Sequence, residues 1–238
     1  IKEKIKGKKE VIFEAKVKNT DRAVGTKLSH YLFKNLSENI SEKKVSLNLI
    51  GSAGQSLGAF LSKNIKIKLL GDANDYVAKG LSGGTIVVKP LTDNFKTDEN
   101  TIIGNTVLYG ATSGKLFASG KAGERFAVRN SGGIAVVEGC DANGCEYMTG
   151  GQIVILGKVG DNFAAGMTGG MAFVYDPQNN FENYVNPTSV IWQAPETDFW
   201  KSKLKKLIEE YDLETDSKIA KKILNNFLLE VKNFKQVC

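Results

Sequence analysis

The chain has 238 residues, and its 32 basic and 26 acidic residues leave a net charge of +6. No apolar run approaches the length of a membrane-spanning helix, and the first ten residues carry too much charge for a signal peptide. The three cysteines, an odd number, disfavour a secreted disulfide scaffold. A chain of this length can bury a sizeable core, so we expect one elongated domain. The first residue is Ile rather than Met, and we therefore expect that the chain is a piece of a longer polypeptide.

The N-terminal segment, residues 1–44, predicts a strand and a helix. The range 11–18 alternates apolar and polar side chains as VIFEAKVK, which is typical of a half-buried strand. A helix is expected to begin near Arg22, capped by Thr20 or Asp21. Its apolar stripe consists of Val24, Leu28, Tyr31 and Leu32. We expect this segment to close the lower end of the architecture that follows, where strand edges would otherwise be unpaired.

One pattern recurs over residues 45–176. Each unit has a Gly, a polar turn, a short middle run, a Gly-Gly pair and then residues rich in β-branched side chains. The pattern is written in GDANDYVAKGLSGGTIVV from position 71, GKAGERFAVRNSGGIAVV from 120, GCDANGCEYMTGGQIVIL from 139 and GKVGDNFAAGMTGGMAFV from 157. The pairs at Gly132, Gly150 and Gly169 are 18 and 19 residues apart. Such a period is typical of a stack of coils.

The short period limits the architecture. A helix pair or a propeller blade needs roughly 34 or 40 residues, so strand-rich units of about 20 predict a mainly β solenoid. We expect about six or seven coils and a height on the order of 30 Å. Glycine is expected at the corners because it takes φ > 0 without steric cost and because tight stacking leaves no room for a Cβ. The alternative is a Greek-key barrel with Gly-rich turns, but barrels rarely space their turns so regularly.

Two features of the array qualify this picture. Runs such as Ile134–Val137 are apolar on both faces, which predicts the packed interior on one side and neighbouring protein on the other. A polar and acidic insert, Leu91–Asn100, interrupts the regular spacing.

Residues 177–238 differ in composition and predict a loop followed by a helical hairpin. The first helix is expected over Glu196–Tyr211, and Asp216 or Ser217 is expected to cap the second. Their apolar stripes are Trp200, Leu204, Leu207, Ile208 and Tyr211, and then Ile219, Ile223, Phe227 and Leu228. We expect the hairpin to cover the last coil or a neighbouring domain. Three aromatic residues of this tail indicate either a docking surface or core of the cap: Trp192, Phe199 and Trp200.

Candidate chemical groups favour structural roles. Most of the charged residues that could form acid–base pairs fall at polar turns, where such side chains satisfy backbone groups: Arg22, Asp72, Asp75, Glu124, Arg125, Arg129, Glu138, Glu146 and Asp161. His30, the only histidine, is predicted on the helix surface. Cys140 and Cys145 could be half of a metal site, but no Cys or His partner lies nearby in the sequence, so free buried thiols are predicted.

The usual ligand-binding motifs are not matched. GATSGKL from Gly110 has three residues between its glycines where a phosphate loop needs four, and the glycines of 51–58 miss the dinucleotide spacing. Lysine clusters without interleaved aromatic residues favour a solvated surface over nucleic-acid binding: 2–9, 63–68 and 201–206. We predict no catalytic, cofactor-binding or metal-binding residue in this chain, and no nucleic-acid or membrane partner.

A family resemblance rests on long phrases in order: GSAGQSLGAFL from Gly51, GDANDYVAKGLSGG, IIGNTVLYGATSG from Ile102, AGERFAVRNSG from Ala122 and GCEYMTGG from Gly144. NTDRAVG and VNP extend it at either end. These phrases resemble the C-terminal GXGXG-motif domain of the glutamate synthase large subunit. The resemblance implies a single-stranded right-handed parallel β-helix. It also implies a non-catalytic part of an oxidoreductase that makes L-glutamate from glutamine and 2-oxoglutarate.

The resemblance further implies that the domain holds the amidotransferase and synthase domains in place. FMN and an iron–sulfur cluster are implied in the parent enzyme, with none in this domain. The implied partners are the other domains of the large subunit and a small NAD(P)H-oxidising subunit or domain. The implied location is the cytoplasm, or a plastid-like organelle in a eukaryote.

Two rival functions remain at this point. One is a β-helix scaffold subunit like that of formylmethanofuran dehydrogenase. The other is a ligand-binding β-helix, for example for carbohydrate, which would present a groove of stacked aromatic residues and carboxylates. In this array Tyr76, Phe126 and Phe163 recur near the same turn, and this regularity predicts that their rings stack inward instead.

Overall fold

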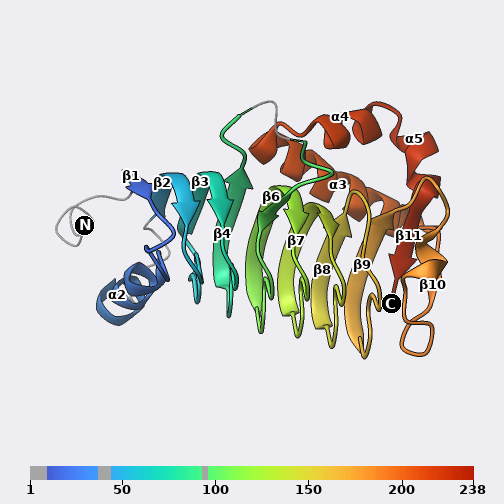
Figure 1. Cartoon of the computed structure of the whole chain (residues 1–238), viewed down its shortest axis with the longest axis horizontal. Coiled ribbons are helices and arrows are strands. Elements are labelled where there is room, and N and C mark those ends of the chain that lie inside the picture. The colour runs from blue at the N-terminus through green and yellow to red at the C-terminus, as the bar shows by residue number, and fades with distance from the viewer. Residues whose placement is uncertain (1–9, 37–43, 93–95) are drawn as a thin grey trace.

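The computed structural model describes residues 10–36, 44–92 and 96–238, and one largely parallel sheet dominates them (Figure 1). The strand order is β1-β2-β3-β4-β6-β7-β8-β9-β11-β10. Neighbours from β1 to β9 pair in parallel, and β11 and β10 are added antiparallel at the far end. The strands are β1 Glu10–Val17, β2 Lys44–Ala53, β3 Ile65–Ala73, β4 Ser82–Lys89, β5 Thr101–Ile103, β6 Ser113–Ala122, β7 Ser131–Cys140, β8 Thr149–Ile155, β9 Gly169–Tyr175, β10 Trp192–Gln193 and β11 Phe234–Val237. The predicted mainly β class is confirmed.

The pairing follows the period found in the sequence. Val45 lies beside Ile65, and Ile134 lies beside Lys115 on one side and Gln152 on the other. β4 pairs directly with β6 across the polar insert, so the insert leaves the stack without breaking it. Directly after the insert, β5 pairs with β3 and β6 away from the main path.

The N-terminal strand β1 is the first member of the stack, since it pairs with β2 along its whole length. Helix α2, Thr26–Leu36, lies beside this end of the sheet (Figure 1). It begins later than predicted because Ala23 and Gly25 have positive φ, and the Ala23 N–H donates to the carbonyl of the next coil's Gln55 at 2.9 Å. The predicted capping role of Asp21 is wrong: its carboxylate accepts from the Lys18 N–H at 2.8 Å.

Each later coil has a turn in which three alternate residues have positive φ, and we call the stack of these turns the turn ladder. Backbone groups join successive turns: the Tyr76 N–H donates to Asn105 O at 2.8 Å, and the Ala78 N–H donates to Leu57 O at 2.9 Å. These hydrogen bonds hold a conformation that L-residues otherwise disfavour. Glycine fills only a minority of the positions in this turn. Elsewhere in the coils several expected corner glycines do have positive φ, as predicted, among them Gly71, Gly120 and Gly151. The turns are Ser56-Gly58-Phe60, Tyr76-Ala78-Gly80, Thr106-Leu108-Gly110, Arg125-Ala127-Arg129, Asn143-Cys145-Tyr147 and Asn162-Ala164-Gly166.

The first glycine of several Gly-Gly pairs is needed for close approach. A Cβ on Gly132 would lie 2.1 Å from the carbonyl oxygen of Thr112 in the preceding coil. A Cβ on Gly150 would lie 2.4 Å from the Ser131 oxygen. No real Cβ approaches a carbonyl oxygen so closely, and therefore the prediction that stacking leaves no room for a side chain is confirmed.

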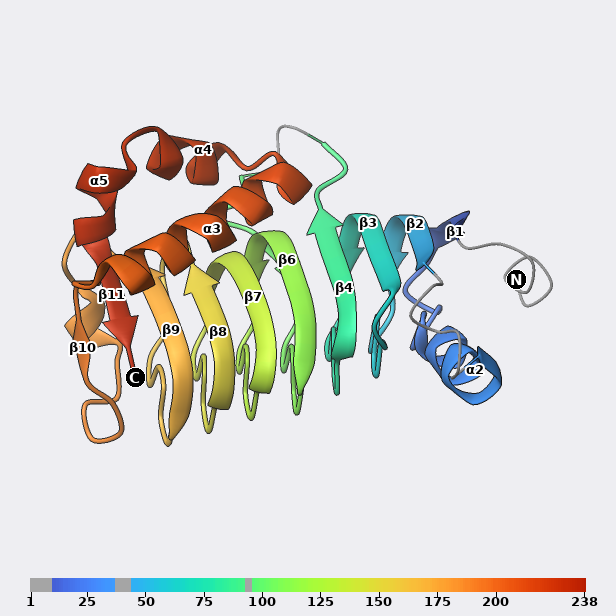
Figure 2. The same ribbon diagram turned by 180° about the vertical axis from the view of Figure 1, so that it is seen from behind.

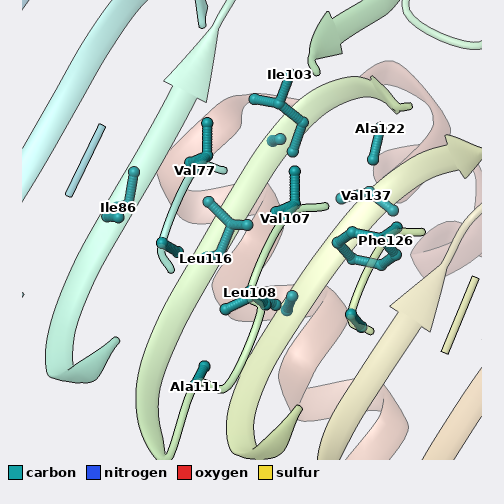
Figure 3. Close-up of a cluster of buried hydrophobic side chains, with 14 of the residues drawn as sticks. Val77, Ile86, Ile103, Val107, Leu108, Ala111, Leu116, Ala122, Phe126 and Val137 are labelled. Carbon is teal, nitrogen blue, oxygen red and sulfur yellow. The ribbon is translucent and has the colours of Figure 1, made fainter. Parts of the chain in front are cut away.

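The interior of the stack is filled by apolar side chains (Figure 3). Ile86 and Leu116 point inward from neighbouring strands, and Phe126 joins them from the turn ladder. All three are fully buried. The residues that follow the inward ones in the strands point outward, yet they are buried as well: Val87, Phe117, Val136, Val154 and Phe173. Something must cover this outer row.

The cover is the chain's own C-terminal helices: α3 Asp198–Thr215, α4 Lys218–Asn225 and α5 Phe227–Glu230 (Figure 2). The 3-10 turns Phe181–Asn183 and Val231–Asn233 flank this region. The second helix is capped by Ser217, as predicted, through a 3.2 Å bond from the Ala220 N–H. α3 lies across β4, β6, β7 and β8, and its Trp200 packs on Phe173 of β9. The hairpin therefore covers one side of the stack, with part of the last coil as predicted, rather than its end. β11 and β10 cover that end instead, because the outer row gives α3 a longer apolar surface.

Candidate functional site

The charged residues singled out in the array do not converge on one site. Asp72 accepts a 3.1 Å hydrogen bond from the Ser52 hydroxyl of the preceding coil. Asp75 accepts from the Asn105 N–H at 2.8 Å. Each of these carboxylates therefore joins two coils, which is a structural task.

One further charged pair also joins two coils, and the other candidates lie at the surface. Arg125 Nε lies 3.0 Å from a Glu146 oxygen, also between neighbouring coils. The Arg129 guanidinium lies over a tyrosine ring, and Arg22, Glu124 and Asp161 are exposed. His30 is exposed on α2, which confirms its predicted place on the helix surface. Within the described ranges, no three His, Cys, Asp or Glu residues are grouped as a metal site would need.

Glu138 is the exception, because its side chain is buried between the sheet and the helices. It is 1% exposed at the end of β7. Its Oε1 accepts hydrogen bonds from the Tyr211 hydroxyl at 2.7 Å, the Ser217 hydroxyl at 2.6 Å and the Ser119 hydroxyl at 3.4 Å. Its Oε2 has no hydrogen-bond partner within the described residues. The carboxylate therefore joins β6, β7, α3 and the cap of α4.

The electrostatics keep the Tyr211 hydroxyl protonated. Burial, and then the negative charge of Glu138, raise the pKa of the Tyr211 hydroxyl well above its usual value. Tyr211 thus remains a donor across the ordinary pH range. Every group of the cluster is buried, and its contacts join the helices to the sheet. The sequence signal was a lone charge directly after the apolar run at 134–137.

The surface hollows do not gather a recognisable set of reactive groups. One, of about 490 Å³, lies beside the last coils and is lined by both signs of charge, including Lys121, Lys158 and Asp176. Lys121 is paired with Asp141 at 2.9 Å, and the Asp176 carboxylate accepts from the N–H groups of Asn180 and Phe181. A second, of about 730 Å³, lies on the outer face of the first strands, beyond the end of α3.

The cysteines are free thiols, as predicted for Cys140 and Cys145. Both of these are buried, whereas Cys238 is exposed. Burial, followed by the charge of Asp141, raises the pKa of the Cys140 thiol to about 12, and burial also raises the pKa of Cys145 well above its usual value. A thiolate is the reactive species, so both groups are chemically protected.

We expect a thiol reagent at pH 8 to label only Cys238 in the native protein and all three cysteines after denaturation. The measurement is the mass added per chain in each state. A Cys238→Ser variant should show no native labelling. Native labelling of Cys140 or Cys145 at the rate of Cys238 would contradict the enclosed interior.

The aromatic residues divide between core and surface. Phe126 and Phe163 are fully buried, as predicted, but Tyr76 is exposed and its predicted inward orientation is wrong. Tyr76 precedes the inward position of its turn by one residue, since Val77 fills that position. In the tail, Trp192 packs on Phe181 and Trp200 on Phe173, with ring centroids about 6 Å apart, whereas Phe199 is exposed. Of the three tail residues, Trp192 and Trp200 thus fit the prediction of a packed cap, and Phe199 fits that of an exposed surface.

Comparison with known proteins gives one consistent family. The GXGXG motif family model matches residues 1–238. The chain is 57% identical over 222 residues to the glutamate synthase [NADPH] large chain of Azospirillum brasilense, which covers 92% of the chain and 15% of that protein. It is 48% identical to the glutamate synthase [NADH] of Schizosaccharomyces pombe, over 95% of the chain and 11% of that protein. It is also 48% identical to the ferredoxin-dependent glutamate synthase of Pyropia yezoensis, over 98% and 15%. The chain thus spans a small part of the length of these relatives.

Proposed function

We propose, from the premise that this chain belongs to the GXGXG-motif family, that it is the non-catalytic structural domain of a glutamate synthase. In this proposal the parent enzyme makes L-glutamate from glutamine and 2-oxoglutarate, and this domain holds its amidotransferase and synthase domains at a fixed separation. Identity with glutamate synthases along nearly the whole chain supports this function over a formylmethanofuran dehydrogenase scaffold. Among the described residues, the exposed rings of Phe60, Tyr76, Tyr109 and Tyr147 line neither of the two hollows, which disfavours a carbohydrate site built on them.

The observation that carries the proposal is the closed construction of the stack. Its interior is filled by buried apolar side chains, and its polar side chains mostly bond to neighbouring coils. Each coil is joined to the next by a β-ladder and by the turn ladder. We read this as a right-handed parallel β-helix with a lower end at 1–44, an array at 45–176 and a tail at 177–238. Such a body keeps its shape, which is what a spacer between two active sites requires.

The cofactors of the parent enzyme belong to its other domains in this proposal. Iron–sulfur clusters are held by groups of cysteine thiolates. Here Cys140 and Cys145 are enclosed in the interior and Cys238 lies at the exposed end of β11, so the cysteines of this chain do not fit a cluster. We assign both the cluster and FMN to the catalytic domains.

The proposed surroundings follow from the same assignment. The partners are the other domains of the large subunit and a small NAD(P)H-oxidising subunit or domain. The location is the cytoplasm, or a plastid-like organelle in a eukaryote. None of the helices in the described ranges is long and apolar enough to cross a membrane.

The test is the coupling of the two reactions in the full-length parent enzyme. A Gly132→Ala substitution, which forces two neighbouring coils of the stack apart, should raise the ammonia released per glutamine consumed while each half-reaction persists with its own substrate. The measurement is the ratio of free ammonia to glutamate formed. Unchanged coupling in a variant whose stack is demonstrably loosened would contradict the proposal.

The isolated chain supplies the complementary control. We expect it to purify without the visible absorption of a flavin and to form no glutamate from glutamine and 2-oxoglutarate. Bound FMN in the isolated chain would place chemistry in this domain and reject the structural role.

A further inference from the structure

A row of exposed aromatic and basic side chains runs along the turn ladder. We define the aromatic stripe as Phe60, Tyr76, Lys79, Tyr109, Arg129 and Tyr147. Its four rings are 36–55% exposed in the part of the chain that the structure describes. Large exposed rings gathered on one side of a soluble domain mark an interaction surface more often than a core defect.

Cation–π contacts hold the members of the stripe in place. Lys79 Nζ lies 5.5 Å from the centre of the Tyr76 ring and 5.9 Å from that of Tyr109, so it joins two coils. The Arg129 guanidinium lies 5.9 Å from the centre of the Tyr147 ring. Such contacts favour the side-chain conformations that hold each cation over its ring.

Glycines of the turn ladder provide platforms for two of the rings. A Cβ on Gly80 would meet the Phe60 ring at 2.5 Å, and a Cβ on Gly166 would meet the Tyr147 ring at 2.4 Å. The rings therefore lie directly over the bare backbone of the next coil. A surface whose side chains are already ordered loses less conformational entropy on binding.

The fold itself does not require these residue types. Equivalent positive-φ positions of other coils hold small polar residues such as Thr106, Asn143 and Asn162. Tyrosine and arginine are, in contrast, the residues that dominate the binding energy of protein interfaces. The two cations over the rings offer positive charge to a partner's carboxylates, and Glu146, the sequence neighbour of Tyr147, is paired with Arg125.

We propose that the aromatic stripe is the surface by which this domain packs against the catalytic domains of its own longer polypeptide. The partner face presents apolar groups to the rings and carboxylates to Lys79 and Arg129. The relatives are several times longer than this chain, so a tethered partner is present at high effective concentration. This inference rests on the proposed function and adds which face of the domain carries it.

The experiment uses the full-length enzyme with three substitutions, Tyr76→Asn, Tyr109→Asn and Tyr147→Asn. Asparagine tolerates the positive φ of positions 76 and 147, so the turn ladder is preserved. The matched control is Leu213→Asn with Leu228→Asn, which alters two side chains more than 80% exposed on the helical layer. Thermal unfolding of both variants should stay close to that of the unchanged enzyme.

The readouts are the rate at which a protease cuts this domain away and the free ammonia released per glutamate formed. We expect both to rise about tenfold in the stripe variant and to stay unchanged in the control, since three interface tyrosines are lost. A rise in the control alone would overturn the stripe while leaving the proposed function standing. If neither variant responds although Gly132→Ala uncouples the enzyme, the stripe is overturned as well.

A rival occupant is single-stranded nucleic acid, which also stacks on aromatic residues beside cations. Fluorescence anisotropy with a labelled thymidine oligomer tests for this binding in the unchanged enzyme and in the stripe variant. We expect no binding by either. Oligomer binding by the unchanged enzyme that the stripe variant loses would overturn the protein interface.

Discussion

Replacing Gly132 by alanine is expected to lower the free energy of unfolding by about 3 kcal/mol or more. The new Cβ would lie 2.1 Å from the Thr112 carbonyl oxygen and 2.8 Å from its carbon. Both atoms belong to the backbone of the preceding coil, so no side chain can rotate to relieve the overlap. The two coils must separate, and the hydrogen bonds between them weaken together. Equilibrium unfolding in urea measures the loss.

Gly110→Ala is the matched control. Gly110 also lies in the array, but no atom lies within 4 Å of the position that its Cβ would occupy. Its φ of +63° costs an L-residue roughly 1–2 kcal/mol. We therefore expect a smaller loss than for Gly132. Gly132 itself has no positive φ, so a loss no larger than that of Gly110→Ala would contradict the argument from close approach between coils.

Tyr211→Ala is expected to cost about 3–5 kcal/mol, the range typical of a buried aromatic residue. Tyr211 is fully buried in α3, its ring centroid lies 6.0 Å from that of Phe117, and its hydroxyl donates to Glu138 at 2.7 Å. The alanine removes the ring that fills the space between helix and sheet and one donor to a buried carboxylate. Chemical unfolding followed by tryptophan fluorescence measures the change, since Trp200 lies on the same helix.

Two further variants separate the causes. Tyr211→Phe keeps the ring and should cost about 1.5–3 kcal/mol, because Ser217 still donates to the same oxygen. Leu213→Ala, on the same helix but 85% exposed, should change stability by no more than about 0.5 kcal/mol. If Tyr211→Phe cost as much as Tyr211→Ala, the cluster around Glu138 would outweigh the packing of the ring.

Gly132→Ala and Tyr211→Ala disturb two different kinds of contact, one between neighbouring coils and one between the helical layer and the sheet. Gly132 sets the distance between neighbouring coils, whereas α3 spans several strands along the stack. Stability in a repeat array is otherwise a sum of nearest-neighbour terms, so its coils can open separately. α3 is also anchored by Glu210 and Glu214, which pair with Lys115 and Lys66. We infer that the helix couples the coils, so that the array unfolds as one unit.

Much of the array could be read from local patterns. The spacing of Gly132, Gly150 and Gly169 predicted parallel stacking, because parallel strands in register repeat at the length of one coil. The same spacing predicted the lack of room for a Cβ. Which residues of each turn point into the interior was harder to predict. A shift of one residue reverses the side of a side chain, and so Tyr76 was placed inward although Val77 holds that position.

The sequence by itself determined the period, the parallel stack and the buried thiols, because each depends on residues of one coil or of two neighbouring coils. Only the tertiary structure decided where the tail lies. The apolar stripe of α3 predicts that the helix packs on another surface. That surface, the outer row of Val87, Phe117 and Val136, forms only when the strands are stacked, so the sequence of the helix could not identify it. The cluster around Glu138 and the aromatic stripe have the same origin, since both join residues from several separate coils or helices.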